Sequence, residues 1–376
     1  MSTNIVITGA GGYLGTRLVS ELISKTDAVI FAIVRDKWSP HSSKLINLKP
    51  GRVHLVSGDV CVPKVARIST LPRIDEFWHL AGSTDFHRKD LATSVNEVGT
   101  ANAVNLAKGL NVKTFFHVST AYVAGSHQGV VAEDVMVEHP RFRNVYEKSK
   151  YKGERIVRGS DLPFIIMRPS IIMGDSVTGE AKSDKMVYGV VKLCERALRI
   201  LQREFGGDIP SNIRYFLKGN REATKNLITI DDVVDLMLSV REKGRTGLTY
   251  HLCNPHSTTI GEIHSSVQHA LGINFLTVAF DYPDNHDIRQ KMIDRGIRVY
   301  EPYTMISDPV FDMANTRSIS DRAIRRVDEK LQCFLYEKYV CVLRESTSIS
   351  TKKLFECVEM TGSHFPVIYK ARFASL

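Results

Sequence analysis

The chain has no apolar run long enough to cross a membrane. A transmembrane helix needs roughly 18 or more uninterrupted apolar residues, and no stretch of this sequence approaches that length. The basic segment that opens a secretory signal peptide is also missing before the first apolar run, at 5–7. We therefore expect a cytoplasmic protein with no transmembrane segment and no signal peptide.

Paired cysteines and metal-binding patterns are missing as well. The six cysteines are scattered without any CxxC pair, which argues against a disulfide framework and against a zinc knuckle. Four histidines lie close together in the sequence but form no HExxH pattern, so no metal is expected. These histidines are His251, His256, His264 and His269.

The chain lacks a long basic run, although its 50 Lys and Arg residues outnumber its 41 Asp and Glu residues and give a net charge of +9. Such an excess could attract nucleic acid, an anionic membrane or phosphorylated small molecules. The basic residues are spread along the chain, and no aromatic series is interleaved with them as in a nucleic-acid groove. We expect phosphorylated ligands and no nucleic acid.

What the sequence does contain is a regular alternation over its first 175 residues. Short β-branched runs alternate with helix-like segments, which is typical of a doubly wound α/β fold whose parallel sheet is covered on both faces. The expected strands are 4–8, 29–34, 53–57, 76–80, 113–119 and 164–168, and the expected helices include 13–24, 95–109 and 145–158.

A glycine-rich turn separates the first expected strand from the first expected helix. The segment Thr8-Gly9-Ala10-Gly11-Gly12-Tyr13-Leu14-Gly15 places glycines at positions 9, 12 and 15. Glycine permits a tight turn, lets backbone N–H groups approach a pyrophosphate and allows close helix packing. We therefore predict that Gly9, Gly12 and Gly15 bind a dinucleotide in a Rossmann domain.

The ends of the second and third strands carry residues that would meet the adenosine half of the dinucleotide. Arg35 lies twenty residues after Gly15, where the adenosine ribose is bound. A guanidinium can pair with a 2′-phosphate, so NADPH is the expected cofactor, but the neighbouring Asp36 keeps NADH open. Asp59, followed by Val60, could accept from the adenine amino group or could cap a helix.

The domain organisation follows from where the alternation stops. It is lost after Gly174 and returns later as a strand, a helix and a strand. We predict that 1–175 form the Rossmann domain and that the chain re-enters it at 226–254. Residues 176–225 and 255–376 should form a smaller, mostly helical substrate-binding lobe. Its expected helices include 186–204, 318–343 and 351–359, and either a monomer or a homodimer is compatible with the pattern.

Tyr146 and Lys150 are four residues apart and therefore lie on one face of the expected helix 145–158. A hydride added to a carbonyl leaves an alkoxide that needs a proton. A phenol of pKa about 10 becomes a better acid or base when a nearby cation stabilises the phenolate. We predict that Tyr146 donates this proton and that Lys150 tunes it and holds the nicotinamide ribose.

A hydroxyl group follows the fifth expected strand. Thr120 stands at a strand carboxyl end, where cofactor and substrate meet, and could hydrogen-bond the carbonyl oxygen together with Tyr146. Ser119 is its rival for this role, and Tyr122 is a second tyrosine close to the predicted site. We assign Thr120 to the catalytic set and Tyr122 to the substrate site.

Together these motifs resemble the extended short-chain dehydrogenases/reductases. The set also includes His79-Leu80-Ala81-Gly82, Asn96 with Gly99-Thr100, and Arg168-Pro169, and it spans residues 4 to about 175. The resemblance implies an NAD(P)H-dependent oxidoreductase. It also implies further cofactor-binding positions within the motifs, namely Tyr13, Leu14, Ala81, Gly82, Asn96, Tyr146, Pro169 and Ser170.

Two later segments narrow the resemblance. Residues 168–179 resemble the RPxxxxGDSxTG segment of thioester reductases, a group that includes fatty acyl-CoA reductases, whereas nucleotide-sugar epimerases usually carry an NVYGP-like segment. Residues 311–316 resemble the late FDxxNT element of the same group. We expect no attached adenylation or carrier domain, so the acyl group should arrive on acyl-CoA or on an acyl carrier protein.

Our interpretation is the NADPH-dependent reduction of an acyl thioester to an aldehyde, which a second round would convert to the alcohol. Asp85 and Phe86 are expected to approach the substrate. Two other reactions stay open, namely ketone reduction and nucleotide-sugar epimerisation or dehydration. A protein that only senses the nucleotide is a further alternative, but it would not need the acid Tyr146.

Overall fold

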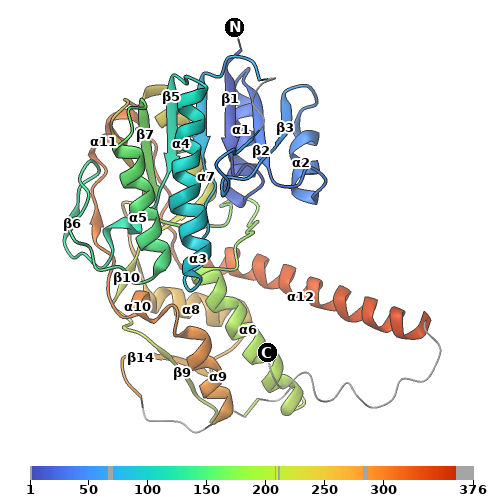
Figure 1. Cartoon of the computed structure of the whole chain (residues 1–376). Coiled ribbons are helices and arrows are strands. Elements are labelled where there is room, and N and C mark those ends of the chain that lie inside the picture. The colour runs from blue at the N-terminus through green and yellow to red at the C-terminus, as the bar shows by residue number, and fades with distance from the viewer. Residues whose placement is uncertain (1, 67–70, 208, 211, 283–286, 361–376) are drawn as a thin grey trace.

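A seven-stranded parallel sheet forms the upper part of the molecule, and a smaller lobe lies below it (Figure 1). The structure is a computed structural model that describes residues 2–66, 71–207, 209–210, 212–282 and 287–360. The strands are β1 Asn4–Thr8, β2 Val29–Val34, β3 Val53–Ser57, β4 Glu76–His79, β5 Thr114–Val118, β7 Phe164–Pro169 and β12 Thr249–Leu252.

The strand order is β12-β7-β5-β4-β1-β2-β3, which confirms the prediction of a doubly wound α/β fold. The chain adds β2 and β3 on one side of β1 and then crosses to place β4 on the other side. The order therefore reverses beside β1. Open α/β sheets bind ligands at such a reversal, outside the carboxyl ends of the strands.

Helices cover both faces of the sheet because successive strand residues point to opposite faces. Ile5 and Ile7 pack in the same core as residues of α1 and α7, whereas Val6 packs in the core that includes α4 residues. The helices of this part are α1 Tyr13–Lys25, α2 Pro40–Leu48, α3 Lys89–Ala92, the π-helical turn η1 Thr93–Val98, α4 Gly99–Gly109, the 3-10 turn η2 Ala121–Ala124, α5 Val145–Arg158 and α7 Ile230–Lys243.

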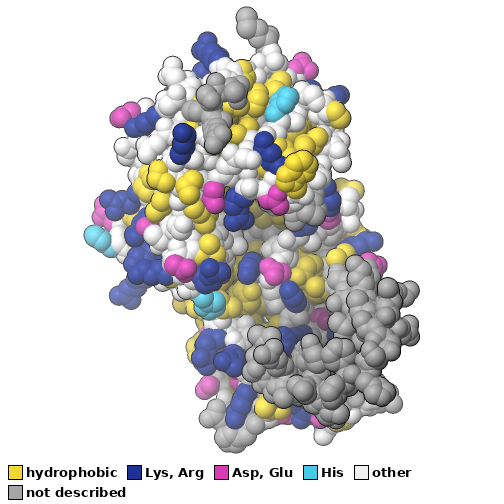
Figure 2. All heavy atoms as spheres, turned by 45° about the vertical axis from the view of Figure 1, so that its right-hand side comes forward, with side chains coloured by type: hydrophobic (Ala, Val, Ile, Leu, Met, Phe, Trp, Pro, Cys, Tyr) yellow, Lys and Arg dark blue, Asp and Glu magenta, His cyan; other side chains and the backbone are white. Residues whose placement is uncertain are grey.

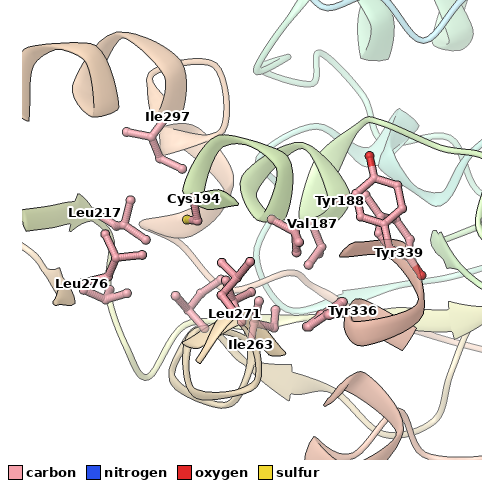
Figure 3. Packing of buried hydrophobic residues seen from close by; sticks show 14 of the residues in the cluster. Val187, Tyr188, Cys194, Leu217, Ile263, Leu271, Leu276, Ile297, Tyr336 and Tyr339 are labelled. Carbon is pink, nitrogen blue, oxygen red and sulfur yellow. The ribbon is translucent and has the colours of Figure 1, made fainter. Parts of the chain in front are cut away.

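The lobe is built from helices and two-stranded sheets around one apolar core, part of which is shown in Figure 3. Its helices are α6 Met186–Glu204, α8 Ile260–Leu271, α9 Ile288–Ile297, α10 Glu301–Thr304 and α12 Glu329–Met360. Its paired strands are β9 Tyr215–Lys218 with β14 Leu276–Ala279, and β10 Thr224–Lys225 with β13 Thr258–Thr259. In Figure 1, α12 extends far beyond the rest of the lobe.

The prediction of one helix over 318–343 is wrong. The structure has α11 Ala314–Ile319, a non-helical segment at 320–328 and then α12. Backbone carbonyls of this segment bind side chains from elsewhere, with Asn254 Nδ2 donating to Arg325 at 2.9 Å and Thr258 Oγ1 donating to Val327 at 3.1 Å. These tertiary hydrogen bonds compete with the helical ones, and the sequence pattern does not report them.

Part of the C-terminal third lies against the sheet. Strand β15 Val310–Phe311 pairs with β6 Val130–Val131, and α11 packs against β12 and α7. Two short strands, β8 Ile171–Met173 and β11 Leu227–Thr229, also pair in parallel. Because β15 and α11 contact β6, β12 and α7, we group residues 310–319 with the sheet. The assignment of the other residues of 255–376 to one lobe stays a prediction.

Figure 2 shows Lys and Arg side chains scattered among acidic ones over both parts of the molecule on the face in view. This agrees with the even spread of charge along the sequence. None of the helices that the structure describes combines the length and the apolar composition needed to cross a bilayer.

Candidate active site

A cleft of about 630 Å³ opens at the reversal point beside β1. Segments that follow β1, β2, β3 and β4 contribute to its walls. Seven residues predicted to bind the cofactor line it, namely Gly9, Gly12, Arg35, Asp59, Val60, Ala81 and Gly82. The cleft therefore gathers the carboxyl ends of four strands, as a dinucleotide site of this fold requires.

The glycine turn fits a dinucleotide because it has no room for side chains. Gly9 has a φ of +74°, and a Cβ there would lie 2.5 Å from the Ala81 backbone nitrogen. A Cβ on Gly15 would lie 2.2 Å from the Gly9 carbonyl oxygen. The turn thus brings the start of α1 close to the strand end, and the positive end of the helix dipole faces the cleft.

The adenosine end of the cleft carries hydroxyl groups that our sequence interpretation missed. Ser39 and Ser42 line the cleft together with Arg35. Ser39 caps α2 by accepting from the Ser42 backbone N–H at 3.2 Å, and Ser42 Oγ donates to the Asp36 carbonyl at 2.6 Å. A serine before Pro40 is an N-cap signal that could have located this helix start.

The neighbouring acidic residues make local turns. The Asp36 carboxylate accepts from the Trp38 backbone N–H at 2.8 Å, and the Asp59 carboxylate accepts from the Cys61 N–H at 2.9 Å. Asp36 thus has a structural partner within its own loop, whereas the exposed Arg35 guanidinium has no hydrogen-bond partner among the described residues. The adenosine end of the cleft thus presents the Arg35 guanidinium beside an aspartate whose carboxylate is held within its own loop.

We expect Arg35→Ala to reduce the preference for NADPH over NADH by roughly 10- to 150-fold, since charge-assisted hydrogen bonds contribute about 1.5–3 kcal/mol. The measurement is the dissociation constant of each nucleotide for wild type and variant. Lys37→Ala is the matched control, because Lys37 is an exposed cation two residues away that does not line the cleft. A wild type that prefers NADH would contradict the assignment.

Thr120 and Tyr146 lie together at the end of β5. Burial raises the pKa of Tyr146 to about 12, although the nearby Thr120 side chain acts to lower it. The phenol is therefore protonated at neutral pH, as a proton donor must be. The Ser119 hydroxyl instead lies near the Glu154 carboxylate and helps to lower the pKa of Glu154, although it makes no well-formed hydrogen bond among the described residues. This position favours Thr120 over Ser119.

Lys150 lies one helical turn beyond Tyr146, and its Nζ donates to the Val118 carbonyl at 2.7 Å. Burial lowers the pKa of Lys150 to about 8, and the Glu154 carboxylate acts in the opposite direction. A Cβ built on Gly82, which lines the cleft, would lie 4.0 Å from Lys150 Nζ. The ammonium is therefore placed beside the cleft, and its hydrogen bond goes to the end of β5 and not to Tyr146.

Asn96, in the π-helical turn η1, connects two walls of the site. Its Oδ1 accepts from the Ser83 backbone N–H at 2.8 Å, and its Nδ2 donates to the Ser83 carbonyl at 2.9 Å and to Ser149 Oγ at 2.8 Å. Ser83 lines the cleft, and Ser149 is the neighbour of Lys150 on α5. Asn96 thus positions the catalytic helix against the loop after β4.

The other predicted cofactor residues do not line the cleft. Tyr13 donates its hydroxyl to the Glu180 carbonyl at 2.8 Å, and Pro169 accepts from Thr120 Oγ1 at 3.4 Å. Leu14 packs against the core shared by α1 and α7, and Ser170 is buried at the end of β7. Their cofactor-binding roles stay predictions that these side-chain contacts do not support.

The three predicted substrate residues differ in their surroundings. The Phe86 ring lies 5.9 Å from the Tyr146 ring. The Asp85 carboxylate accepts from the backbone N–H groups of His87 and Arg88 at 2.9 and 2.8 Å, as in an ordinary turn. The buried Tyr122 donates to Asp308 at 2.6 Å. Phe86 is thus the predicted substrate residue whose side chain lies against Tyr146.

Our sequence interpretation missed the residues that connect α5 to the lobe. Tyr303 donates to Glu147 Oε1 at 2.6 Å, and its ring lies 5.8 Å from Phe86. Tyr300 lies 6.3 Å from Phe86 on the same side. Tyr303 is 156 residues from Glu147 in the chain, so no local signal could have paired them.

An apolar cavity of about 70 Å³ lies in the lobe beneath these aromatic rings. Tyr300 and Tyr303 line it, so that Phe86 and these two tyrosines stand between the cavity and Tyr146. Apart from Lys218, Lys225, His264 and Thr304, every described lining residue is apolar or aromatic. Figure 3 shows some of them, including Val187, Leu217, Ile263 and Ile297, pointing toward the centre of the lobe.

The two motifs that narrowed the resemblance have structural contacts. In GDSxTG, the Asp175 side chain accepts from Thr178 and pairs with Arg17 of α1 at 2.8 Å, while Ser176 bonds to Asp231 of α7. In FDxxNT, Thr316 Oγ1 donates to the buried Glu133 at 2.7 Å. The first motif ties a turn to two sheet-covering helices, and the second ties α11 to the loop before α5.

The family model described as male sterility protein, an NAD-binding family, matches residues 7–205. A linear gramicidin synthase of Brevibacillus parabrevis is 25% identical over 297 residues, which cover 70% of this chain and 5% of that protein. The nonribosomal peptide synthetase asaC of Aspergillus flavus is 24% identical over 85% of this chain and 34% of its own length. This chain thus spans only a small part of these relatives.

Solved structures share the fold. The terminal R domain of the myxalamid PKS-NRPS pathway superposes with a TM-score of 0.72 at 22% identity, covering 90% of this chain and 91% of that one. A UDP-glucuronic acid 4-epimerase of Bacillus cereus with NAD superposes with a TM-score of 0.62 at 18% identity, covering 90% and 96%. With its cleft, its Tyr146 and Lys150, and a family match over half its length, the chain belongs to the male sterility protein family of extended short-chain dehydrogenases/reductases, which are NAD(P)-binding oxidoreductases.

Proposed function

We propose that this protein reduces an acyl thioester to an aldehyde with NADPH. The observation that carries the proposal is the apolar cavity behind Tyr300 and Tyr303, because its walls suit a hydrocarbon chain. The sugar ring of a nucleotide sugar would need hydrogen-bond partners for its hydroxyl groups, and the mostly apolar walls of this cavity offer few of them. The likeness to the nonribosomal peptide synthetase asaC and to a thiolation-reductase di-domain of an archaeal non-ribosomal peptide synthetase supports a thioester substrate.

The identity of the cofactor rests on the adenosine end of the cleft. The Arg35 guanidinium and the N-terminus of α2, capped by Ser39, would hold a 2′-phosphate. The glycine turn would hold the pyrophosphate, and Lys150 would hold the nicotinamide ribose. The bound NADPH supplies the hydride.

The residues around the carbonyl complete the reaction. Thr120 and Tyr146 donate hydrogen bonds to the thioester oxygen, and the Tyr146 proton moves to this oxygen as the carbonyl carbon gains the hydride. The resulting hemithioacetal collapses when its C–S bond breaks. The sulfur leaves as a thiol with a proton, and the carbon becomes the aldehyde. The hydride and the proton from Tyr146 account for the two added hydrogens.

The test is to follow NADPH oxidation and thiol release together on acyl thioesters, ketones and nucleotide sugars. We expect one free thiol for each NADPH oxidised when the product stops at the aldehyde, and one for every two when it continues to the alcohol. NADPH oxidation on ketones alone, without thiol, would replace this proposal by ketone reduction. NADPH binding without turnover on any of these substrates would favour the alternative that the protein only senses the nucleotide.

A further inference from the structure

A second cleft, of about 680 Å³, lies on the lobe side of Tyr146. Three segments line it: 86–87 after β4, 142–148 at the start of α5, and 295–302 at the end of α9 and beyond. Phe86 is part of its wall and also contacts Tyr146. None of its described lining residues lines the dinucleotide cleft. Through Phe86, this second cleft adjoins Tyr146 from outside the dinucleotide cleft.

The walls of this cleft are strongly basic. Arg143, Lys148, Arg295 and Arg298 line it, and none of the described lining residues is acidic. Lys148, Arg295 and Arg298 are exposed, and no ion pair joins them to any residue that the structure describes. Three of these four cations have no ion-pair partner among the described residues, so the cleft has a positive potential that favours an anionic ligand.

Arg143 gives an independent indication of a ligand. Its side chain is 3% exposed and pairs with Glu147 through Nη1 at 3.3 Å. Nη1 also donates to the Gly125 carbonyl at 2.6 Å, but within the described residues Nε and Nη2 have no hydrogen-bond partner. Guanidinium stays charged at any physiological pH, and leaving its buried donors unpaired is costly. The guanidinium also lies over the Tyr303 ring, 5.1 Å from its centroid, so an acceptor in the cleft reaches these two groups only after a shift of the Arg143 side chain.

We infer that this cleft binds the phosphate of a phosphopantetheine thioester, an inference that rests on the proposed function. The two ends of such a substrate differ. The acyl chain is apolar and suits the cavity behind Tyr300 and Tyr303, whereas the thiol side carries a phosphate. Arginine forks match phosphate oxygens. Asn144 and Val145 also line the cleft, so the N-terminus of the 14-residue helix α5 adds its positive dipole end.

Three thioesters of one acyl group test the inference, made with pantetheine, with 4′-phosphopantetheine and with coenzyme A. The phosphorylated thioesters should have a KM at least about tenfold below that of the pantetheine thioester, as expected for charge-assisted hydrogen bonds to one phosphate. The double variant R295A/R298A should lose most of this ratio. Lys291→Ala is the matched control, because Lys291 is an exposed cation on α9 outside the cleft, and it should keep the ratio.

Direct binding of free 4′-phosphopantetheine and of coenzyme A, measured by calorimetry without NADPH, separates this inference from the proposed function. Binding that weakens at least about tenfold in R295A/R298A supports the phosphate site even if no thioester is reduced. Equal affinity for the two ligands would mean that the cleft recognises the phosphopantetheine arm that they share. Both coenzyme A and a carrier protein would supply this arm. Thioester reduction with the same KM for pantetheine and phosphopantetheine would overturn the inference and leave the proposed function intact.

Discussion

Tyr146→Phe is expected to lower the turnover number by about 10²- to 10⁴-fold, which is the usual contribution of a positioned acid. The dissociation constant of NADPH should stay near the wild-type value, because the lost group is a proton donor beside Thr120 and not part of the dinucleotide cleft. Tyr151→Phe is the matched control on the same helix, since its hydroxyl donates to the Val137 carbonyl outside the site. Near-normal turnover of purified Tyr146→Phe would refute the assignment.

The pH dependence of NADPH binding distinguishes the role of Lys150 from that of Tyr146. The pKa of Tyr146, raised to about 12, keeps the phenol protonated over the whole accessible range. The pKa of Lys150, lowered to about 8 by burial, means that the free enzyme loses the ammonium charge as the pH rises through 8. NADPH affinity should therefore fall above about pH 8 in wild type and in Tyr146→Phe, and this fall should disappear in Lys150→Ala.

Glu154→Ala is expected to lower the free energy of unfolding by about 3–5 kcal/mol, the usual cost of removing one partner of a buried ion pair. Glu154 is fully buried on α5 and accepts two hydrogen bonds from Arg168 of β7, at 2.6 and 3.1 Å. It also pairs with Arg158 at 3.0 Å. Without the carboxylate, the Arg168 charge stays buried and unbalanced. Urea unfolding with an unchanged slope measures the loss.

Acid should reproduce part of this effect in the wild type. Burial acts to raise the pKa of Glu154, but Arg168 and Arg158 outweigh it and lower the pKa to about 2. Since the folded pKa lies below the unfolded one, the stabilisation is complete above the ordinary glutamate pKa of 4.5 and is lost as the pH falls toward 2. The gap between wild type and Glu154→Ala should therefore narrow in acid. Asp161→Ala is the control, because its pair with Lys108 is exposed and should contribute little.

Much of the Rossmann domain could be predicted because its signals are local. The strands Asn4–Thr8, Val29–Val34 and Val53–Ser57 have their predicted bounds, and so does the helix Val145–Arg158. In the lobe, the helix Met186–Glu204 also has its predicted bounds. Buried parallel strands read as short β-branched runs. The glycine turn constrains its own backbone, so its position beside the cleft also follows from residues that are adjacent in the chain.

The GDSxTG and FDxxNT motifs pointed to the thioester-reductase group, although their residues do not line the dinucleotide cleft. Asp175 and Thr316 belong to motifs that suggested the thioester-reductase group, yet their side chains tie separate elements together. These contacts hold elements of the fold together, and they do not locate a substrate. Its contacts were visible only once α1, α7 and the loop around Glu133 were placed in space.

The sequence by itself determined the doubly wound fold, the dinucleotide turn and the helical pairing of Tyr146 with Lys150, because each depends on neighbours within a few residues. Only the tertiary structure decided that Thr120 and not Ser119 lies at Tyr146, that Tyr303 joins Glu147 across 156 residues, and that Arg143 meets the arginines of α9 in one basic cleft. These contacts form between segments that the folding of the whole chain brings together, so no local pattern encodes them.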